Sequence, residues 1–331
     1  MKAVLFAATA LVSLGVSVTA EAVTTTTVEV ATLDDLRGVT VTTGGPNVIV
    51  VRGHSAANDG GGGVFVRNGT SCTDDDGVVV QEPSGKGSWC WFRQFSGPVH
   101  LPWYGVKDAA SPGCLPPNDI TSCAADHVLG PDGVTYIDPI LNAFNAALQS
   151  NALGGDGGVT TDGRSIVIDN ANLNVPENQY FTCSGPPGGS RQQVGTGLKY
   201  YWTLPNSIVL NPAFTVTRER QSKLSSCIIR PTWYVSTTTT DLTIPPTNVM
   251  QTVQMMHQFA GTATSCPMED IFIIGFDICE DNDKSLKSVL SNLSEECLLD
   301  EWIHDNGGGM KLQNFIVKQY IEGSLPTVWT M

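Results

Sequence analysis

The chain has 331 residues, a formal net charge of −14, 34 glycines and 19 prolines. Its acidic excess repels nucleic-acid backbones and anionic membrane surfaces, and no local cluster of lysine and arginine offsets it. Low charge density with many Gly, Pro, Thr and Val residues favours short strands joined by turns. We therefore expect an all-β protein that binds neither nucleic acid nor a membrane.

Residues 1–22 have the pattern of an export signal. Lys2 precedes an apolar run from Ala3 to Val18, and small residues at Ala20 and Ala22 suit cleavage. The run is too short and too often interrupted for a membrane span. We expect a secreted, extracellular chain that begins near Val23, in which disulfide bonds form.

The nine cysteines are an odd number, so one stays free or pairs outside this chain. Short separations along the chain suggest three pairs, although sequence alone does not determine connectivity: Cys72 with Cys90, Cys114 with Cys123, and Cys266 with Cys279. No CxxC or HExxH motif occurs, so the sequence identifies no metal ligands.

Residues 23–105 alternate short β runs with turns and predict a β-rich head domain. The glycines at 60–63 could suggest a phosphate-binding loop. They lack the GK[ST] ending and the strand-to-helix context, which favours a tight turn before the Val64–Val66 strand.

Residues 106–135 contain two cysteines, several prolines and no periodicity, and predict an insertion. One convincing helix follows, with Asp138 as its N-cap and Pro139 at its first position. Its expected apolar face comprises Ile140, Leu141, Phe144, Ala147 and Leu148. A helix directly before a long β region suits a cap over the open end of a solenoid.

Residues 136–331 are expected to hold this capping helix and the first coils of a parallel β-helix. Ile273-x-Gly275-Phe276-x-Ile278 matches Leu312-x-Asn314-Phe315-x-Val317, as stacked coils would, with 280–308 looping out between them. Only three or four coils are expected after Gly163, which fits three alternatives: a short domain, an assembly-dependent subunit or a truncated gene product. Two unrelated strands of a β-sandwich are the alternative.

The motif order in the head resembles the pectate-lyase superfamily, including rhamnogalacturonase/epimerase-like and phage tailspike-like members. The matching stretches are 58–65, 76–80, 87–93 and 103–107, followed by the helix at 139–148. The family's junction motif is split here by the insertion, and Tyr136-Ile137-Asp138 replaces its acidic pair. The resemblance covers roughly residues 33–185 and implies a right-handed parallel β-helix of the pectin-lyase fold behind a small β head domain.

Two kinds of chemistry are known for such folds, and each needs clustered carboxylates. Glycosidases use paired acids, whereas lyases bind Ca²⁺ through acids and use a basic residue to remove a proton. The acidic candidates are Asp277, Asp281 and Asp283, with Glu280 between them, where the chain is expected to turn out of a coil. A solvated turn is the simpler interpretation of such a charge cluster, and Asp74-Asp75-Asp76 is interpreted as a plain turn between head strands.

Sugar rings stack on aromatic side chains, and several aromatics fall in one region of the sequence. The substrate-binding candidates are Tyr201, Trp202, Arg218 and Trp233, although core packing and an exposed strand edge explain them as well. The resemblance implies a secreted polysaccharide-active protein, a glycoside hydrolase or a polysaccharide lyase, with a glycan as partner. The alternative is a non-catalytic glycan-binding or structural tailspike-like module, for which a homotrimer is the expected assembly.

Overall fold

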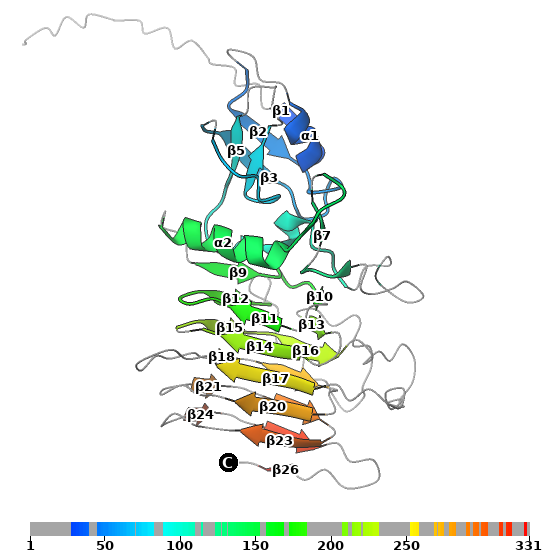
Figure 1. Cartoon of the computed structure of the whole chain (residues 1–331), viewed down its shortest axis with the longest axis vertical. Helices are drawn as coiled ribbons and strands as arrows, with labels where there is room; N and C mark the ends of the chain where they lie inside the picture. Colours follow the sequence, from blue (N-terminus) through cyan, green and yellow to red (C-terminus); the bar gives the residue numbers. More distant parts are fainter. Residues whose placement is uncertain are drawn as a thin grey trace, which may run out of the picture.

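The structure is a computed structural model that describes residues 28–39, 45–69, 71–82, 89–109, 114, 123–126, 128–130, 132–152, 157–168, 172–183, 207–210, 214–219, 221–231, 252–257, 268–269, 271–274, 278–282, 289–291, 294–297, 299–303, 311–313, 316–319 and 328–329. A small sheet near the N-terminus lies above a long stack of strands, with one helix across the boundary (Figure 1). The expected export signal, residues 1–22, lies outside the described residues.

The small sheet, called the head sheet below, has the strand order β1-β2-β3-β5-β4. The last four strands of this order pair antiparallel, and β1 pairs parallel with β2. Alternate residues of these strands pack on helix α1 (Leu33–Gly38), in a core that includes Phe65 and Trp91. Its strands are β1 (Val28–Val30), β2 (Val48–Val51), β3 (Gly63–Arg67), β4 (Val79–Gln81) and β5 (Cys90–Gln94).

Helix α1 was not expected from the sequence, which indicated a single helix. Thr32 accepts a hydrogen bond from the Asp35 backbone N–H, and the Asp35 side chain accepts one from Thr32 N–H, which completes a capping box. The helix buries Leu33 and Leu36 completely against the sheet. Because it spans only six residues, its apolar spacing is too short to show a helical period.

Below the head, the chain winds in rotation through three sheets, called stack sheets 1, 2 and 3, whose strands pair parallel except for the last pair of stack sheet 2. Stack sheet 1 contains β6 (Val99–His100), β9 (Gly158–Thr160), β12 (Tyr180–Thr182), β15 (Lys223–Ser225), β18 (Met268–Glu269), β21 (Val289–Ser291) and β24 (Lys311–Gln313). Stack sheet 2 contains β10 (Ile166–Ile168), β13 (Ser207–Leu210), β16 (Ile228–Pro231), β19 (Phe272–Ile274), β22 (Ser294–Cys297), β25 (Ile316–Gln319) and β26 (Val328–Trp329). Stack sheet 3 contains β11 (Asn172–Val175), β14 (Phe214–Arg218), β17 (Thr252–His257), β20 (Ile278–Asn282) and β23 (Leu299–Ile303).

The rotation repeats with a fixed step in part of the stack. In stack sheet 1, the register column that starts at Val159 continues through Phe181, Leu224, Met268, Leu290 and Leu312. The successive separations in this column are 22, 43, 44, 22 and 22 residues. The basic coil therefore takes 22 residues, and two coils carry insertions of about the same length again.

Several apolar stretches of the stack supply strands to two different sheets. The run at residues 165–175, for example, supplies β10 to stack sheet 2 and β11 to stack sheet 3. Five full rotations and the start of a sixth are described, so the expectation of three or four coils is too low.

The expected alignment of two late segments is wrong. Ile273 lies in stack sheet 2 and pairs with Glu295, whereas Leu312 lies in stack sheet 1 and pairs with Leu290. The residues between them do not loop out as one insertion, since β20 to β23 lie there and supply strands to all three sheets. Short apolar patterns of equal spacing arise at every corner of the coil, so their likeness does not establish register.

Helix α2 (Pro139–Ala152) closes the upper end of the stack (Figure 1). The side chain of Asp138 accepts a hydrogen bond from the Leu141 backbone N–H at 3.0 Å and caps the helix as expected. Phe144 is buried in one core cluster with Val159 and Phe181 of the first coils. Two residues of the expected apolar face, Leu141 and Leu148, are instead 53% exposed, because the buried face is centred on Ala143, Phe144 and Ala147.

Among the described residues, three disulfide bonds hold loops in place, two of which the sequence predicted. Cys72–Cys90 lies at the head sheet and Cys114–Cys123 lies in the insertion. The insertion also adds to the edge of stack sheet 2, since Ala125 N–H donates to the Val167 carbonyl. The third bond, Cys183–Cys227, joins two successive coils and was not predicted. The expected partner of Cys279, Cys266, lies outside the described residues.

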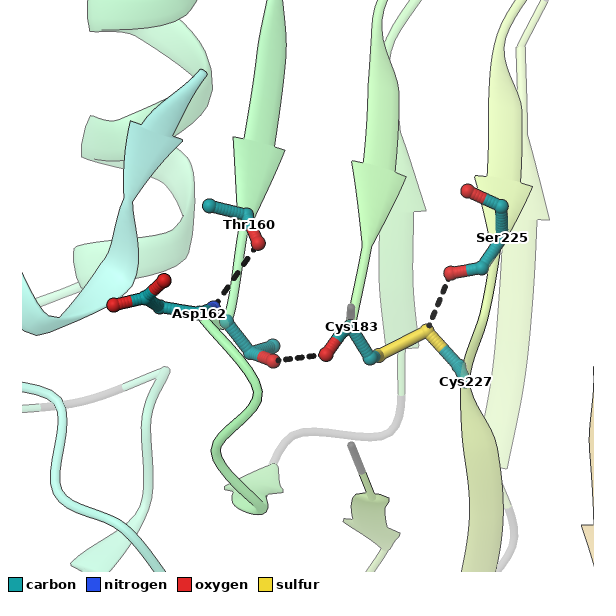
Figure 2. The surroundings of a disulfide bond; sticks show 6 residues. Thr160, Asp162, Cys183, Ser225 and Cys227 are labelled. Carbon is teal, nitrogen blue, oxygen red and sulfur yellow. Dashed lines mark hydrogen bonds between the residues drawn. A yellow bond between two sulfur atoms is a disulfide. The ribbon is translucent and has the colours of Figure 1, made fainter. Parts of the chain in front are cut away.

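Figure 2 shows the surroundings of this third bond. Thr161 Oγ1 donates to the Cys183 carbonyl at 3.2 Å, and the Cys183 backbone N–H donates to the Ser225 carbonyl. The bond lies just after β12 and just before β16. It therefore joins the two coils that are separated by the 43-residue step from Phe181 to Leu224.

Candidate functional site

Most of the predicted site residues lie outside the described residues. These are Asp277, Asp283, Tyr201, Trp202 and Trp233. The backbones of Asp281 and Arg218 are described, in β20 and β14 of stack sheet 3. Strand β17 lies between these two strands, and Arg218 pairs with His257 while Asp281 pairs with Met255. The two residues share a sheet but not a register position.

The acidic segment was expected to be a turn, and this expectation is wrong for residues 278–282, which form strand β20. Asp281 occupies the register column of Leu173, Val216 and Met255, whose first two members are buried. Glu280 occupies the neighbouring column, with Gln254 and Trp302. Period-2 alternation therefore separates neighbouring acids that the sequence treated as one cluster.

The best-defined polar site in the described part of the chain lies where the head sheet meets the stack. We call it the junction cluster: Arg37, His54, Asp59, Asp74, Asp75, Asp76, Arg93, Tyr104 and Arg164. It draws together all four head motifs on which the family resemblance rests, which supply Asp59, Asp76, Arg93 and Tyr104.

Arg93 fills the centre of the junction cluster. Its guanidinium donates three hydrogen bonds, to the carbonyls of Gly61, Gly62 and Gly77 at 2.6–3.0 Å. The same group lies between the rings of Phe65 and Trp103, each 4.6 Å from the guanidinium carbon. Burial lowers the pKa of Arg93 to about 10.

The glycines at 60–63 lead into strand β3 as predicted, but the tight turn itself lies just before them at Ala57 and Asn58, where Asp59 N–H donates to the Ala56 carbonyl. A Cβ at Gly63 would stand 2.3 Å from the Arg93 guanidinium, and one at Gly60 would stand 2.0 Å from that of Arg164. Gly60 also has a φ of +92°, which side chains disfavour. A Cβ at Gly61 would instead meet His54 at 2.4 Å, and one at Gly62 would meet the Arg52 carbonyl at 2.6 Å, so all four positions lack room for a side chain.

Arg37 holds the acidic turn from the other side. Its guanidinium binds Asp74 Oδ2 at 2.9 Å and Asp76 Oδ1 at 2.6 Å, and both carboxylates are mostly or fully buried. Hydrogen bonds and charge attraction from these two carboxylates outweigh burial and raise the pKa of Arg37. His54 Nε2 lies 3.1 Å from the second oxygen of Asp76.

Asp75 is the one acid of this turn that makes no salt bridge in the described residues. Its Oδ1 accepts hydrogen bonds from three successive backbone N–H groups, those of Gly77, Val78 and Val79. Its Oδ2 accepts one from the Tyr104 hydroxyl at 3.3 Å. Burial raises the pKa of Asp75 to about 6, despite the opposing effect of the three N–H groups. Burial also raises the pKa of Tyr104.

The sequence located the acidic triplet but interpreted it as a plain turn. Asp76 is buried, Asp74 is mostly buried, and their partner Arg37 is nearly forty residues away. Reasoning from the sequence missed Arg37, His54 and Arg164, because no local pattern pairs residues so far apart.

Asp59, preceded by the left-handed Asn58, accepts four backbone hydrogen bonds, and those bonds lower the pKa of its carboxyl against the effect of burial.

The described side chains include no group of three or more histidines, cysteines or acids that could hold a metal ion. In the described part of the chain, no helix has the length and apolar character to cross a bilayer.

Comparison with known proteins finds one family. The phage tail protein small four-stranded β-sheet domain matches residues 29–96. The matched segment contains the four antiparallel strands β2 to β5. The match confirms the predicted resemblance to tailspike-like proteins. No curated protein matches the sequence.

Several solved structures have a similar course of the chain. The enzymatically active domain of tailspike protein 2 from bacteriophage CBA120 is 15% identical, with a TM-score of 0.48 over 83% of this chain and 36% of that one. The Acinetobacter phage vB_ApiP_P1 tailspike is 13% identical, with a TM-score of 0.43 over 88% of this chain and 50% of that one. Pantoea stewartii WceF, described as a glycan biofilm modifying enzyme with a tailspike-like parallel β-helix fold, is 11% identical, with a TM-score of 0.37 over 91% and 51%.

This chain thus spans between about a third and a half of the length of these structures. Its described elements are mostly strands, and its residues 29–96 match the phage-tail β-sheet domain.

Proposed function

We propose that the chain is a right-handed parallel β-helix that holds a polysaccharide along the side of its stack. The observation that supports this best is the rotation of the chain through three parallel sheets directly beneath the phage-tail-type head sheet. Parallel crossovers in one sheet are right-handed in nearly all proteins, which sets the expected hand of the coil. Such a stack offers one long side on which successive coils add equivalent positions for a chain of repeating sugars.

Cleavage of that glycan is the further part of the proposal. Asp277, Asp281 and Asp283 are the proposed acids, either as the general acid and base of a hydrolase or as calcium ligands of a lyase. Tyr201, Trp202, Arg218 and Trp233 are the proposed glycan contacts. A secreted location belongs to the same proposal, since disulfide bonds form outside the reducing cytosol. A homotrimer is the assembly proposed with it.

The test is a glycan panel applied to the chain from Val23 onward, with calcium and with a chelator. Binding is measured by retention on immobilised glycans, and cleavage by new reducing ends and by ultraviolet absorption of unsaturated uronides. Unsaturated product that needs calcium would identify a lyase, and reducing ends without unsaturation would identify a hydrolase.

Retention without product would favour the non-catalytic tailspike-like module instead. Folded protein that is not retained on any glycan and releases no product would refute the proposed function. Asp281→Asn is the informative variant, and Asp132→Asn, an exposed acid of the β7–β8 hairpin (Val128–Leu129 and Tyr136–Ile137), is its control.

A further inference from the structure

A serine, a histidine and an acid lie in contact at the edge of the junction cluster. The Ser55 hydroxyl lies 2.7 Å from Nδ1 of His54, and Nε2 of the same ring lies 3.1 Å from Asp76 Oδ2. Ser55 is exposed, whereas His54 and Asp76 are buried. An accessible nucleophile thus contacts a buried base, which an acid contacts in turn, and this arrangement activates serine for acyl transfer.

The partners of Nε2 determine where the proton of the neutral His54 ring lies. Nε2 faces two oxygens of Asp76, a carboxylate oxygen and the backbone carbonyl at 3.2 Å. The carboxylate is ion-paired with Arg37 through its other oxygen, so both groups are acceptors. Nε2 therefore carries the proton, and Nδ1 keeps a lone pair that accepts the Ser55 O–H. In the best-known serine hydrolases the serine contacts Nε2, whereas here it contacts Nδ1 because Ser55 directly follows the histidine in the chain.

The His54 ring and the backbone of Ser55 are both held in place. Gly105 follows the short helix η1 (Leu101–Tyr104) with a φ of +75°, and a Cβ there would stand 2.7 Å from both Cε1 and Nδ1 of the His54 ring. The ring thus packs directly on the Gly105 backbone. Asp59 accepts the backbone N–H groups of His54 and Ser55 at 2.9 and 2.8 Å. Base and nucleophile are therefore positioned before any substrate arrives, as efficient catalysis requires.

We propose that Ser55 and His54 hydrolyse carboxylic esters, with Asp76 as the residue that positions His54. Ser55 Oγ attacks the ester carbonyl carbon while its proton passes to His54 Nδ1. The bond between that carbon and the alkoxy oxygen breaks, the alcohol leaves with the proton from Nδ1, and the acyl group stays on Oγ. A water molecule, deprotonated by Nδ1, then attacks the acyl group, releases the carboxylic acid and restores the serine.

The backbone around the serine favours esters over amides as substrates. The N–H groups of Ser55 and Ala56 both donate to Asp59 Oδ2, so neither is available for an oxyanion hole. Such a donor contributes about 10²–10³ to the rate, and a general base about 10²–10⁴. We therefore expect slow turnover and substrates whose alcohol leaves readily. This activity is separate from the proposed glycan binding, and either can fail without the other.

A fluorophosphonate probe tests for the activated serine on the whole folded chain. The probe forms an Oγ–P bond with loss of fluoride, and trypsin then releases residues 53–67 as one peptide, in which Ser55 is the only residue with a hydroxyl group. We expect mass spectrometry to find the label in this peptide. Ser55→Ala should lose that label and lower the hydrolysis of p-nitrophenyl acetate about 100-fold, after subtraction of the rate in buffer.

Two further variants separate the activated serine from ordinary surface reactivity. Ser71→Ala, which removes another exposed hydroxyl of the head, is the matched control and should keep both the label and the hydrolysis. His54→Gln removes the base but keeps Ser55, and should lower the labelling rate about 100-fold. An unlabelled peptide 53–67 from the folded, unaltered chain would overturn the proposal, and so would undiminished labelling of His54→Gln.

Nitrogen-15 NMR of the histidine rings tests the positioning role of Asp76. In the unaltered chain the neutral His54 ring should carry its proton on Nε2, with the signals assigned by their absence in His54→Gln. Asp76→Asn leaves its oxygen to Arg37 and turns its NH₂ group toward Nε2, which should move the ring proton to Nδ1 and stop the labelling of Ser55. A proton on Nδ1 in the unaltered chain would make Ser55 the acceptor and overturn the mechanism.

Discussion

The replacement of Arg93 by lysine should strongly destabilise the head. Lysine keeps the positive charge but offers one compact donor group in place of the planar fork, so two of the three carbonyls of Gly61, Gly62 and Gly77 lose their partner. Each orphaned buried carbonyl costs about 1–3 kcal/mol, and weaker stacking between Phe65 and Trp103 adds about 0.5–1 kcal/mol. The free energy of unfolding should fall by about 2.5–7 kcal/mol.

Denaturation in urea at pH 7, followed by tryptophan fluorescence and by far-ultraviolet circular dichroism, measures this fall. Arg67→Lys is the control, since Arg67 also stacks on a tryptophan, Trp89 at 4.6 Å, but makes a single bond to Asn47 at the protein surface. That change should cost less than about 1 kcal/mol. Equal effects of the two lysine variants would refute the idea that the three backbone carbonyls make Arg93 irreplaceable.

Two other predictions concern the loops. Replacing Cys183 and Cys227 by serine opens a loop with a sequence separation of 44 and should lower the free energy of unfolding by up to about 4 kcal/mol in a denaturant titration, and a change below about 1 kcal/mol would contradict the clamp between coils. Gly60→Ala should shift the Arg164 guanidinium off the Asp59 carbonyl and destabilise the chain more than Gly133→Ala, because both positions have positive φ but only Gly60 has a close neighbour. Thermal melting of both variants compares them, and equal shifts would show that backbone strain alone matters.

Much of the head could be predicted from the sequence because its strands alternate apolar and polar residues between turn signals. The runs that contain Val48–Val51, Gly63–Arg67 and Cys90–Gln94 are strands as expected. In the stack the same rule found the apolar runs but not their corners. A run such as 165–175 keeps its apolar character while it passes from one sheet to the next, so periodicity does not reveal the bend.

The polar sites were harder to predict for two physical reasons. Acidic triplets usually lie in solvent, and Asp74–Asp76 is enclosed only because Arg37 and Tyr104 arrive from distant parts of the chain. The acids at 277–283 were grouped by proximity in sequence, whereas strand alternation assigns Glu280 and Asp281 to different register columns. Their role in glycan cleavage stays a prediction.

The uneven coil lengths suggest how such a protein can change its specificity. Each coil contacts only the coils above and below it, so extra residues at a corner leave the 22-residue ladder of the others undisturbed. In the two long steps, of 43 and 44 residues, the extra residues lie at different corners, after β12 and after β16. The Cys183–Cys227 bond holds together the coils on both sides of the step of 43 residues. Corner segments can therefore be exchanged or lengthened during evolution, much as loops on a rigid frame, without refolding of the frame itself.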